Sequence, residues 1–185
     1  MKETVLFIDA GYLSYISKFL GGGQPVRYKL EIFAKNICGA FNLGCKEIFF
    51  YVAPPYQSPK PTEEENKRKA SYDRFIKKLK TVKPTVHVRE GRLQKIDNSF
   101  TQKGVDTLIT MDLLKIAMKK DVDEIVIITS DTDFVPIIQD VRKSSGIKVN
   151  LAYYTDRKRK SAFSLSNHLW EAVDKKVLIR KEHFK

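Results

Sequence analysis

The sequence has few cysteines and no long apolar segment. Its two cysteines, Cys38 and Cys45, are too few for a disulfide framework or a four-ligand zinc site. No apolar run approaches the roughly 20 residues that span a bilayer. The N-terminus has neither a basic segment nor an A-x-A-like cleavage site. We therefore expect a reduced, cytoplasmic protein with no membrane partner.

Nucleotide-binding loops and paired histidines are also missing. The glycine run 21–23 is not followed by Gly-Lys-Ser/Thr, so it predicts a flexible loop rather than a phosphate cradle. A metal-free, histidine-based ribonuclease needs two imidazoles side by side. His87 is expected within a strand, and His168 and His183 lie near the C-terminus, so core or surface roles are favoured for all three.

Positive charge is what the sequence has in excess. The length of 185 residues suits one α/β domain, and 42% hydrophobic and 11% aromatic residues are enough for a core. The chain carries 34 Lys and Arg against 22 Asp and Glu, a net charge of +12. Segments 60–103 and 156–185 hold the whole surplus, with 13 basic against 6 acidic residues and 9 against 4. This predicts a polyanionic partner, nucleic acid or an acidic membrane surface, or else a solvated basic surface.

Short apolar runs predict a parallel sheet, because they are continuous rather than alternating. They lie at 5–8, 48–52, 125–128 and 149–154, with a further strand at 86–88 and a hairpin arm at 92–97. Apolar residues at helical spacing predict helices around 30–41, with Gly44 as a C-cap, and around 72–79, 108–118 and 134–141. Four of the seven prolines fall in 54–62 and predict a long loop. The alternation of strand and helix favours a doubly wound α/β sheet.

Aspartates gather where the predicted strands end. Asp9 follows the first strand, Asp131 and Asp133 follow a later one, and Asp106 begins a helix. In an open α/β sheet the carboxyl ends of the strands line the ligand crevice, so these side chains converge if the two strands are neighbours. Each also has a capping interpretation. Ser130 with Asp133 fits a capping box, Asp106 an N-cap, and Asp9 a turn.

Taken together, the aspartates favour a site over separate caps. Carboxylates held close repel one another, and the usual remedies are a shared proton or a bound cation. An oxygen-rich site without His or Cys suits Mg²⁺ or Mn²⁺ rather than Zn²⁺. Such ions bind phosphate oxygens and lower the pKa of a coordinated water, as phosphodiester hydrolysis requires.

Three motifs stand in order along the chain. They are Phe7-Ile8-Asp9-Ala10-Gly11-Tyr12, Lys103-Gly104-Val105-Asp106 and Ser130-Asp131-Thr132-Asp133-Phe134-Val135-Pro136. Together they resemble the NYN domain, in the LabA-like (DUF88) branch of the PIN-like nuclease superfamily, over about residues 3–154. Many NYN proteins have Asn shortly after the first aspartate, whereas this chain has Gly11-Tyr12, as LabA-like members often do.

The resemblance implies a three-layer α/β/α PIN-like Rossmannoid fold with a central, mostly parallel sheet. Residues 1–155 would form the NYN (PIN-like) domain, and 156–185 a basic C-terminal segment that packs on or completes it. The resemblance also implies a metal-dependent ribonuclease, with Mg²⁺ or Mn²⁺ held by Asp9, Asp106, Asp131 and Asp133. Asp112 matches a further family position, which we place at the edge of the site or in the layer behind the ligands.

Single-stranded RNA is the expected partner, and a homodimer is a further expectation because PIN-like domains often dimerise. The residues expected to contact the RNA backbone are basic or adjoin the acidic site: Lys67, Arg68, Lys103, Ser130, Arg157, Lys158, Arg159 and Lys160. The basic helix around 67–78 also has a plain interpretation, as the solvated side of an amphipathic helix.

Two alternatives remain beside the nuclease. A non-catalytic RNA-binding or regulatory module could keep the same fold, because fold alone does not settle activity. The apolar run before Asp131-x-Asp133 also resembles the haloacid dehalogenase nucleophile motif. That motif normally opens its domain, whereas here only 52 residues follow Asp133, so this alternative is disfavoured.

Overall fold

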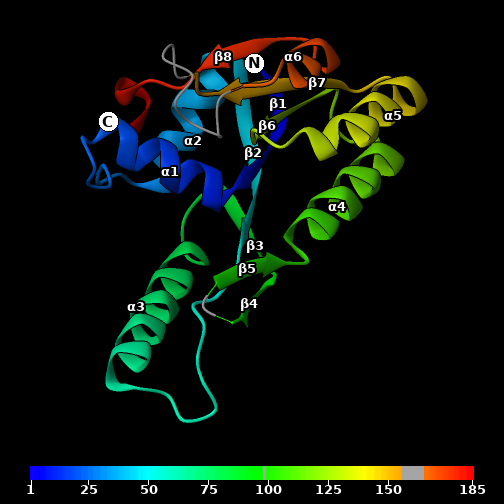
Figure 1. The fold of residues 1–185 in the computed structure, drawn as a ribbon. Helices are drawn as coiled ribbons and strands as arrows, with labels where there is room; N and C mark the ends of the chain where they lie inside the picture. Colours follow the sequence, from blue (N-terminus) through cyan, green and yellow to red (C-terminus); the bar gives the residue numbers. More distant parts are fainter. Residues whose placement is uncertain (98, 156–164) are drawn as a thin grey trace.

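Continuous apolar runs build the centre of the protein. The structure, a computed structural model, describes residues 1–97, 99–155 and 165–185 (Figure 1). Within these ranges six strands form one sheet: β1 (Lys2–Asp9), β2 (Leu43–Val52), β3 (Thr85–Glu90), β6 (Glu124–Ile128), β7 (Lys148–Tyr153) and β8 (Lys176–Leu178). All five residues of β6 are buried, as expected of a central parallel strand with both faces covered.

The sheet order reverses at its centre. The strands lie in the order β3-β2-β1-β6-β7-β8, and each neighbouring pair is parallel. The chain builds β2 and β3 outward on one side of β1 and then returns to place β6 on its other side. The carboxyl ends of β1 and β6 therefore flank the point where an open α/β sheet has its ligand crevice.

Helices cover both faces of the sheet and enclose two apolar cores. The first core packs α1 (Ala10–Leu20) and α2 (Leu30–Gly39) against one face, and the 3-10 turn η2 (Lys181–Phe184) adds Phe184 to it. The second packs α4 (Val105–Lys119), α5 (Val135–Ser145), α6 (Asn167–Ala172) and the 3-10 turn η1 (Thr132–Phe134) against the other. This confirms the expected three-layer α/β/α architecture with a mostly parallel sheet. We call the sheet and these helices the body.

A second region, which we call the lobe, extends beyond the carboxyl ends of β2 and β3 (Figure 1). It consists of the loop 53–62, α3 (Glu63–Leu79) and an antiparallel hairpin of β4 (Arg92–Ile96) and β5 (Ser99–Lys103). On α3 the buried residues are Ile76 and Leu79. In the hairpin strands, Leu93 is half-buried and the other residues are exposed. The lobe is therefore held by few apolar contacts.

Two local expectations are wrong. Gly44 does not cap the helix before it, because α2 ends at Gly39 and Gly44 lies within β2. The chain reverses instead at Asn42, which has a positive φ of 60° and takes the left-handed conformation that Asn tolerates. Asp9 does not lie in an isolated turn, because it is the N-cap of the helix α1.

The C-terminal part of the chain contributes to the body. Strand β8 pairs in parallel with β7 and extends the sheet at that edge. Asn36 of α2 donates hydrogen bonds to the carbonyl oxygens of His183 and Lys185, at 3.2 and 2.9 Å. The domain division at residue 155 stays a prediction. In the parts of the chain that the structure describes, no helix is long and apolar enough to cross a membrane.

Candidate functional site

Two aspartates follow the neighbouring strands β1 and β6. Ile8 and Ile128 are register partners, so Asp9, the last residue of β1, and Asp131, three residues beyond Ile128, lie at the same edge of the sheet. Since this is the point where the strand order reverses, the fold brings both to the expected crevice. The conditional prediction that the two strands are neighbours is thereby confirmed.

Backbone N–H groups that follow each strand hold the side chain of its aspartate in place. The Oδ1 atom of Asp9 accepts hydrogen bonds from the N–H groups of Gly11 and Tyr12, at 2.9 and 3.2 Å, and so caps α1. Asp131 Oδ1 accepts from the N–H of Asp133 at 2.8 Å and caps η1. Capping and site formation are therefore not alternatives for these two aspartates, because the caps orient their carboxylates. The other two capping predictions are wrong, because Gly104 rather than Asp106 is the N-cap of α4, and Ser130 forms no capping box with Asp133.

Asp106 reaches the same edge from α4. Gly91, at the end of β3, lets the start of α4 approach closely, because a Cβ there would lie 2.6 Å from the carbonyl oxygen of Lys103 and 2.7 Å from Val105 Cγ2. Gly104, the N-cap of α4, has φ +82°, the left-handed conformation that favours glycine. These two glycines place the first turn of α4, and Asp106 with it, beyond the carboxyl end of β3.

The four predicted ligands influence one another electrostatically. Burial raises the pKa of Asp9, and the negative charges of Asp106 and Asp131 raise it further, although its hydrogen bonds from Tyr12 and Gly11 act in the opposite direction. Partial burial raises the pKa of Asp106, and the charges of Asp131 and Asp133 add to this. We call Asp9, Asp106, Asp131 and Asp133 the acidic centre.

The acidic centre fits a divalent cation in its chemistry but is not a closed cage. Its donors are carboxylate oxygens under mutual repulsion, which a hard cation such as Mg²⁺ or Mn²⁺ relieves. Among the residues that the structure describes, however, no three His, Cys, Asp or Glu side chains are arranged to hold a metal ion. Mg²⁺ is commonly bound through one or two carboxylates, with waters and substrate phosphates completing its shell. The arrangement suits that open type of site.

Asp112 lies in a buried ion-pair network. Its side chain is 3% exposed, and it accepts from Arg89 Nε at 2.8 Å, from the Tyr51 hydroxyl at 3.1 Å and from Lys115 Nζ at 3.3 Å. Burial and the charge of Asp112 raise the pKa of Tyr51. Tyr51 is the register partner of Asp9, so the network adjoins the acidic centre through β2. The expected place of Asp112 behind the ligands stays a prediction.

The residues predicted to bind RNA fall into different settings. Lys67 and Arg68 form ion pairs of 2.6 Å with Glu63 and Glu64, one turn earlier on exposed α3. Lys103 is exposed at the end of β5, and Ser130 immediately precedes Asp131. The run 157–160, that is Arg157, Lys158, Arg159 and Lys160, lies outside the described residues.

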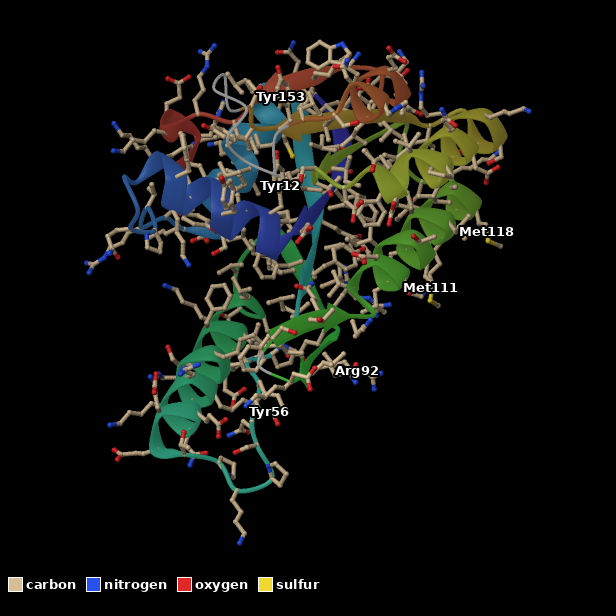
Figure 2. The ribbon with its side chains drawn as sticks, viewed as in Figure 1. Tyr12, Tyr56, Arg92, Met111, Met118 and Tyr153 are labelled. Carbon is tan, nitrogen blue, oxygen red and sulfur yellow. The ribbon has the colours of Figure 1, made fainter. Side chains whose placement is uncertain are left out.

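The hairpin contains residues that the sequence did not single out. Gln102 of β5 reaches toward the start of α1, because a Cβ built on Gly11 would lie 3.8 Å from Gln102 Oε1 and 3.2 Å from Asp9 Oδ1. Phe100 of β5 is 53% exposed and packs against Tyr56 of the loop 53–62, with ring centroids 5.5 Å apart. Figure 2 labels Tyr56 within the lobe. The predicted hairpin arm, 92–97, ended before Phe100, so the available sequence signal was an aromatic residue between Lys95 and Lys103.

Comparisons with known proteins find one matching family and a solved structure of the same fold. The family described as the NYN domain matches residues 3–174. A crystal structure of a protein of unknown function from Vibrio parahaemolyticus superposes with a TM-score of 0.63 at 18% sequence identity. The match covers 99% of this chain and 95% of that one, so the two share the fold. A search of curated proteins finds no match.

Proposed function

The chain belongs to the NYN domain family, and on that premise we propose that it is a metal-dependent ribonuclease acting on single-stranded RNA. The family suggests membership of the PIN-like nuclease superfamily. Within it we assign the chain to the LabA-like branch, on the Gly11-Tyr12 pair after the first aspartate. The observation that carries the proposal is the acidic centre at the reversal of the strand order, where burial and neighbouring charges together raise the pKa of Asp9 and Asp106.

Each carboxylate has a defined part in the proposed reaction. Asp9 and Asp131 are fixed by the backbone of α1 and η1 and would hold Mg²⁺ or Mn²⁺. Asp106, on α4, and Asp133, on η1, would add negative charge that attracts the cation. A divalent cation supplies a water of lowered pKa and neutralises charge on the phosphate during hydrolysis. The expected products are a 5′-phosphate and a 3′-hydroxyl.

The basic residues would bring the RNA backbone to a centre that otherwise repels it. Lys103 precedes α4, and the run 157–160 follows the central strand β7. Lys and Arg that contact phosphates provide affinity without sequence preference and make binding dependent on salt. The aspartates thus define the chemistry of the proposed site, and the surplus of positive charge defines its substrate.

The test is cleavage of end-labelled single-stranded RNA by the purified protein with Mn²⁺. We expect cleavage that chelator abolishes and that Asp131→Asn lowers at least ~100-fold. The amide oxygen of Asn can still accept from the N–H of residue 133, so the local fold should persist. Asp140→Asn is the matched control, because Asp140 is exposed on α5, outside the acidic centre. Cleavage that survives chelator or Asp131→Asn would contradict the proposal.

A second candidate is a non-catalytic RNA-binding module. It draws support from the lack of a closed ligand set among the described residues. This module would bind RNA in a salt-dependent manner, without turnover and without measurable affinity for Mn²⁺. Titration calorimetry with Mn²⁺ alone separates the two candidates, because a nuclease site binds the ion and loses that binding in Asp131→Asn.

A further inference from the structure

We propose that one face of the hairpin is a stacking site for an unpaired base, next to the acidic centre. The face consists of Leu93, Lys95, Phe100 and Gln102, and we call it the inner face. The inference rests on the proposed function for its substrate class, single-stranded RNA. Beyond that function, the inference names the residues that would select unpaired nucleotides.

The register of the hairpin defines this face. Lys95 pairs with Phe100 and Leu93 pairs with Gln102, and directly opposite residues project to the same side of an antiparallel pair. Alternate residues of a strand also share a side, so Phe100 and Gln102 lie together. The other side carries the remaining pairs: Arg92 with Lys103, Gln94 with Thr101, and Ile96 with Ser99. We call this the outer face.

The inner face leads away from the acidic centre. Gln102 lies at its near end, since its Oε1 atom would be 3.8 Å from a Cβ on Gly11, the residue whose N–H donates to Asp9. Phe100 is two residues farther along β5, about 7 Å away. A single-stranded RNA bound at Asp9 would therefore pass Gln102 and reach Phe100 within a short distance.

An exposed phenylalanine that packs on a half-buried tyrosine is the feature that indicates a base. Phe100 is 53% exposed and contacts Tyr56, whose ring is tilted by 57° to it. The pair presents apolar area without joining either core of the body. Aromatic rings of this kind stack on unpaired bases of any identity. A base in a duplex is already stacked on both sides, so the site selects single strands.

Charge complementarity favours nucleic acid as the occupant. Residues 92–103 carry three basic side chains, Arg92, Lys95 and Lys103, and one acidic side chain, Asp97. None of these three cations takes part in an ion pair between described residues, in contrast to Lys67, Arg68 and Lys69 of α3. Lys95 stands directly opposite Phe100, so a phosphate and its base can be bound together.

The experiment measures binding of a fluorescent single-stranded oligouridine and of an RNA duplex of equal length, in chelator so that no cleavage occurs. We expect Phe100→Leu to weaken binding of the single strand about 5- to 150-fold, the factor equivalent to ~1–3 kcal/mol per stacked base. Duplex binding should not change. Leu keeps the apolar contact with Tyr56, so the hairpin should stay folded, and Phe100→Trp should restore or exceed wild-type affinity.

Two matched variants separate stacking from charge. Ile96→Leu changes a 47% exposed residue on the outer face and should leave both affinities unchanged. Lys95→Gln should lower the salt dependence of single-strand binding by about 0.7 in log–log slope, whereas Phe100→Leu should leave that slope unaltered. Equal losses for Phe100→Leu and Ile96→Leu, or equal losses for single strand and duplex, would overturn the stacking site.

The binding test of the stacking site and the cleavage test of the proposed function can fail independently. A protein that binds RNA through Phe100 but cleaves none with Mn²⁺ keeps the stacking site and loses the nuclease. If the protein cleaves RNA and its Phe100→Leu variant binds like wild type, the nuclease stands and the stacking site is rejected.

Discussion

Phe7 and Phe100 are both phenylalanines in β-strands, but they occupy opposite environments. Phe7, in β1 of the body, is 1% exposed and stacks on Phe49 with ring centroids 5.2 Å apart. Phe100, in the lobe, is half exposed and contacts one loop tyrosine. A residue type alone therefore does not assign a role. In the body, aromatic rings pack on one another within the sheet. In the lobe, the exposed ring of Phe100 lies opposite Lys95, which forms no ion pair with another described residue.

The largest expected difference between the two regions is in stability. Phe7→Ala should lower the free energy of unfolding by ~3–5 kcal/mol, because it leaves a cavity between β1, β2 and the helices. Phe100→Ala should cost less than ~1 kcal/mol, since that ring is already largely in water. Urea denaturation measures both. Similar costs would show that the hairpin belongs to the core.

The ion pair of Arg89 with Asp112, which joins β3 to α4 within the body, should be the next most sensitive place. Arg89→Leu leaves the buried carboxylate of Asp112 without its closest cation, and we expect a loss of ~2–3 kcal/mol. This is below the range for a fully buried pair, because Arg89 is 32% exposed and Lys115 remains nearby. In the double variant Arg89→Leu with Asp112→Leu, much of that loss should be recovered. Arg92→Leu, an exposed control on the hairpin, should not change the urea midpoint.

The acidic centre should make stability depend on pH. The pKa of Asp9 is raised in the folded protein, so the folded state holds its proton more tightly than the unfolded chain does. Metal-free protein should therefore lose stability as pH rises from near the unfolded value through the raised pKa, and the penalty is complete above it. Asp9→Asn keeps the cap but removes the charge. The melting temperature of this variant relative to that of the wild type should increase as the pH rises above about 4, the ordinary pKa of an Asp side chain.

The test is whether the difference in melting temperature between Asp9→Asn and wild type increases with pH. A constant or falling difference between Asp9→Asn and wild type would mean that the pKa of Asp9 is not raised in the folded protein. Adding Mn²⁺ at neutral pH should stabilise the wild type and have less effect on the variant, because a ligand of the folded state stabilises it by mass action.

The smallest effects are expected on α3. Lys67→Ala should change stability by less than ~0.5 kcal/mol, because its ion pair with Glu63 is exposed and screened. The negative charge of Glu63 also weakens the attraction between Lys67 and the RNA phosphates. Lys67→Ala should thus weaken RNA binding less than Lys95→Gln does, as measured by fluorescence anisotropy at one salt concentration. The reverse order would identify α3, rather than the hairpin, as the main contact of the lobe.

Much of the body was predictable from local pattern. The apolar runs of β1 and β6 are continuous, and the aspartates follow them directly, so both the buried strands and the edge where Asp9 and Asp131 meet could be expected. The helix α1 could not, because Asp9 and Gly11 also fit a turn. Strand β8 is only three residues long, too short to show a period.

Contacts between distant segments were beyond the sequence. The odd position of Asp112 on a packing helix was noticeable, but its partner Arg89 lies 23 residues away on β3. The approach of Gln102 to Gly11 depends on Gly91, which allows β5 and α4 to pass close to β3. Such contacts are set by how whole elements pack, and no spacing within one element encodes them.

The sequence by itself determined most of the strands and helices of the body, the basic surplus and the order of the acidic motifs, because these follow from local hydrophobic period and composition. Only the tertiary structure decided which strands are neighbours and which charges are already paired. It placed β6 beside β1, so that the charge of Asp131, more than a hundred residues along the chain, adds to burial in raising the pKa of Asp9. It also left the hairpin uncovered, because a two-stranded ribbon cannot bury both of its faces.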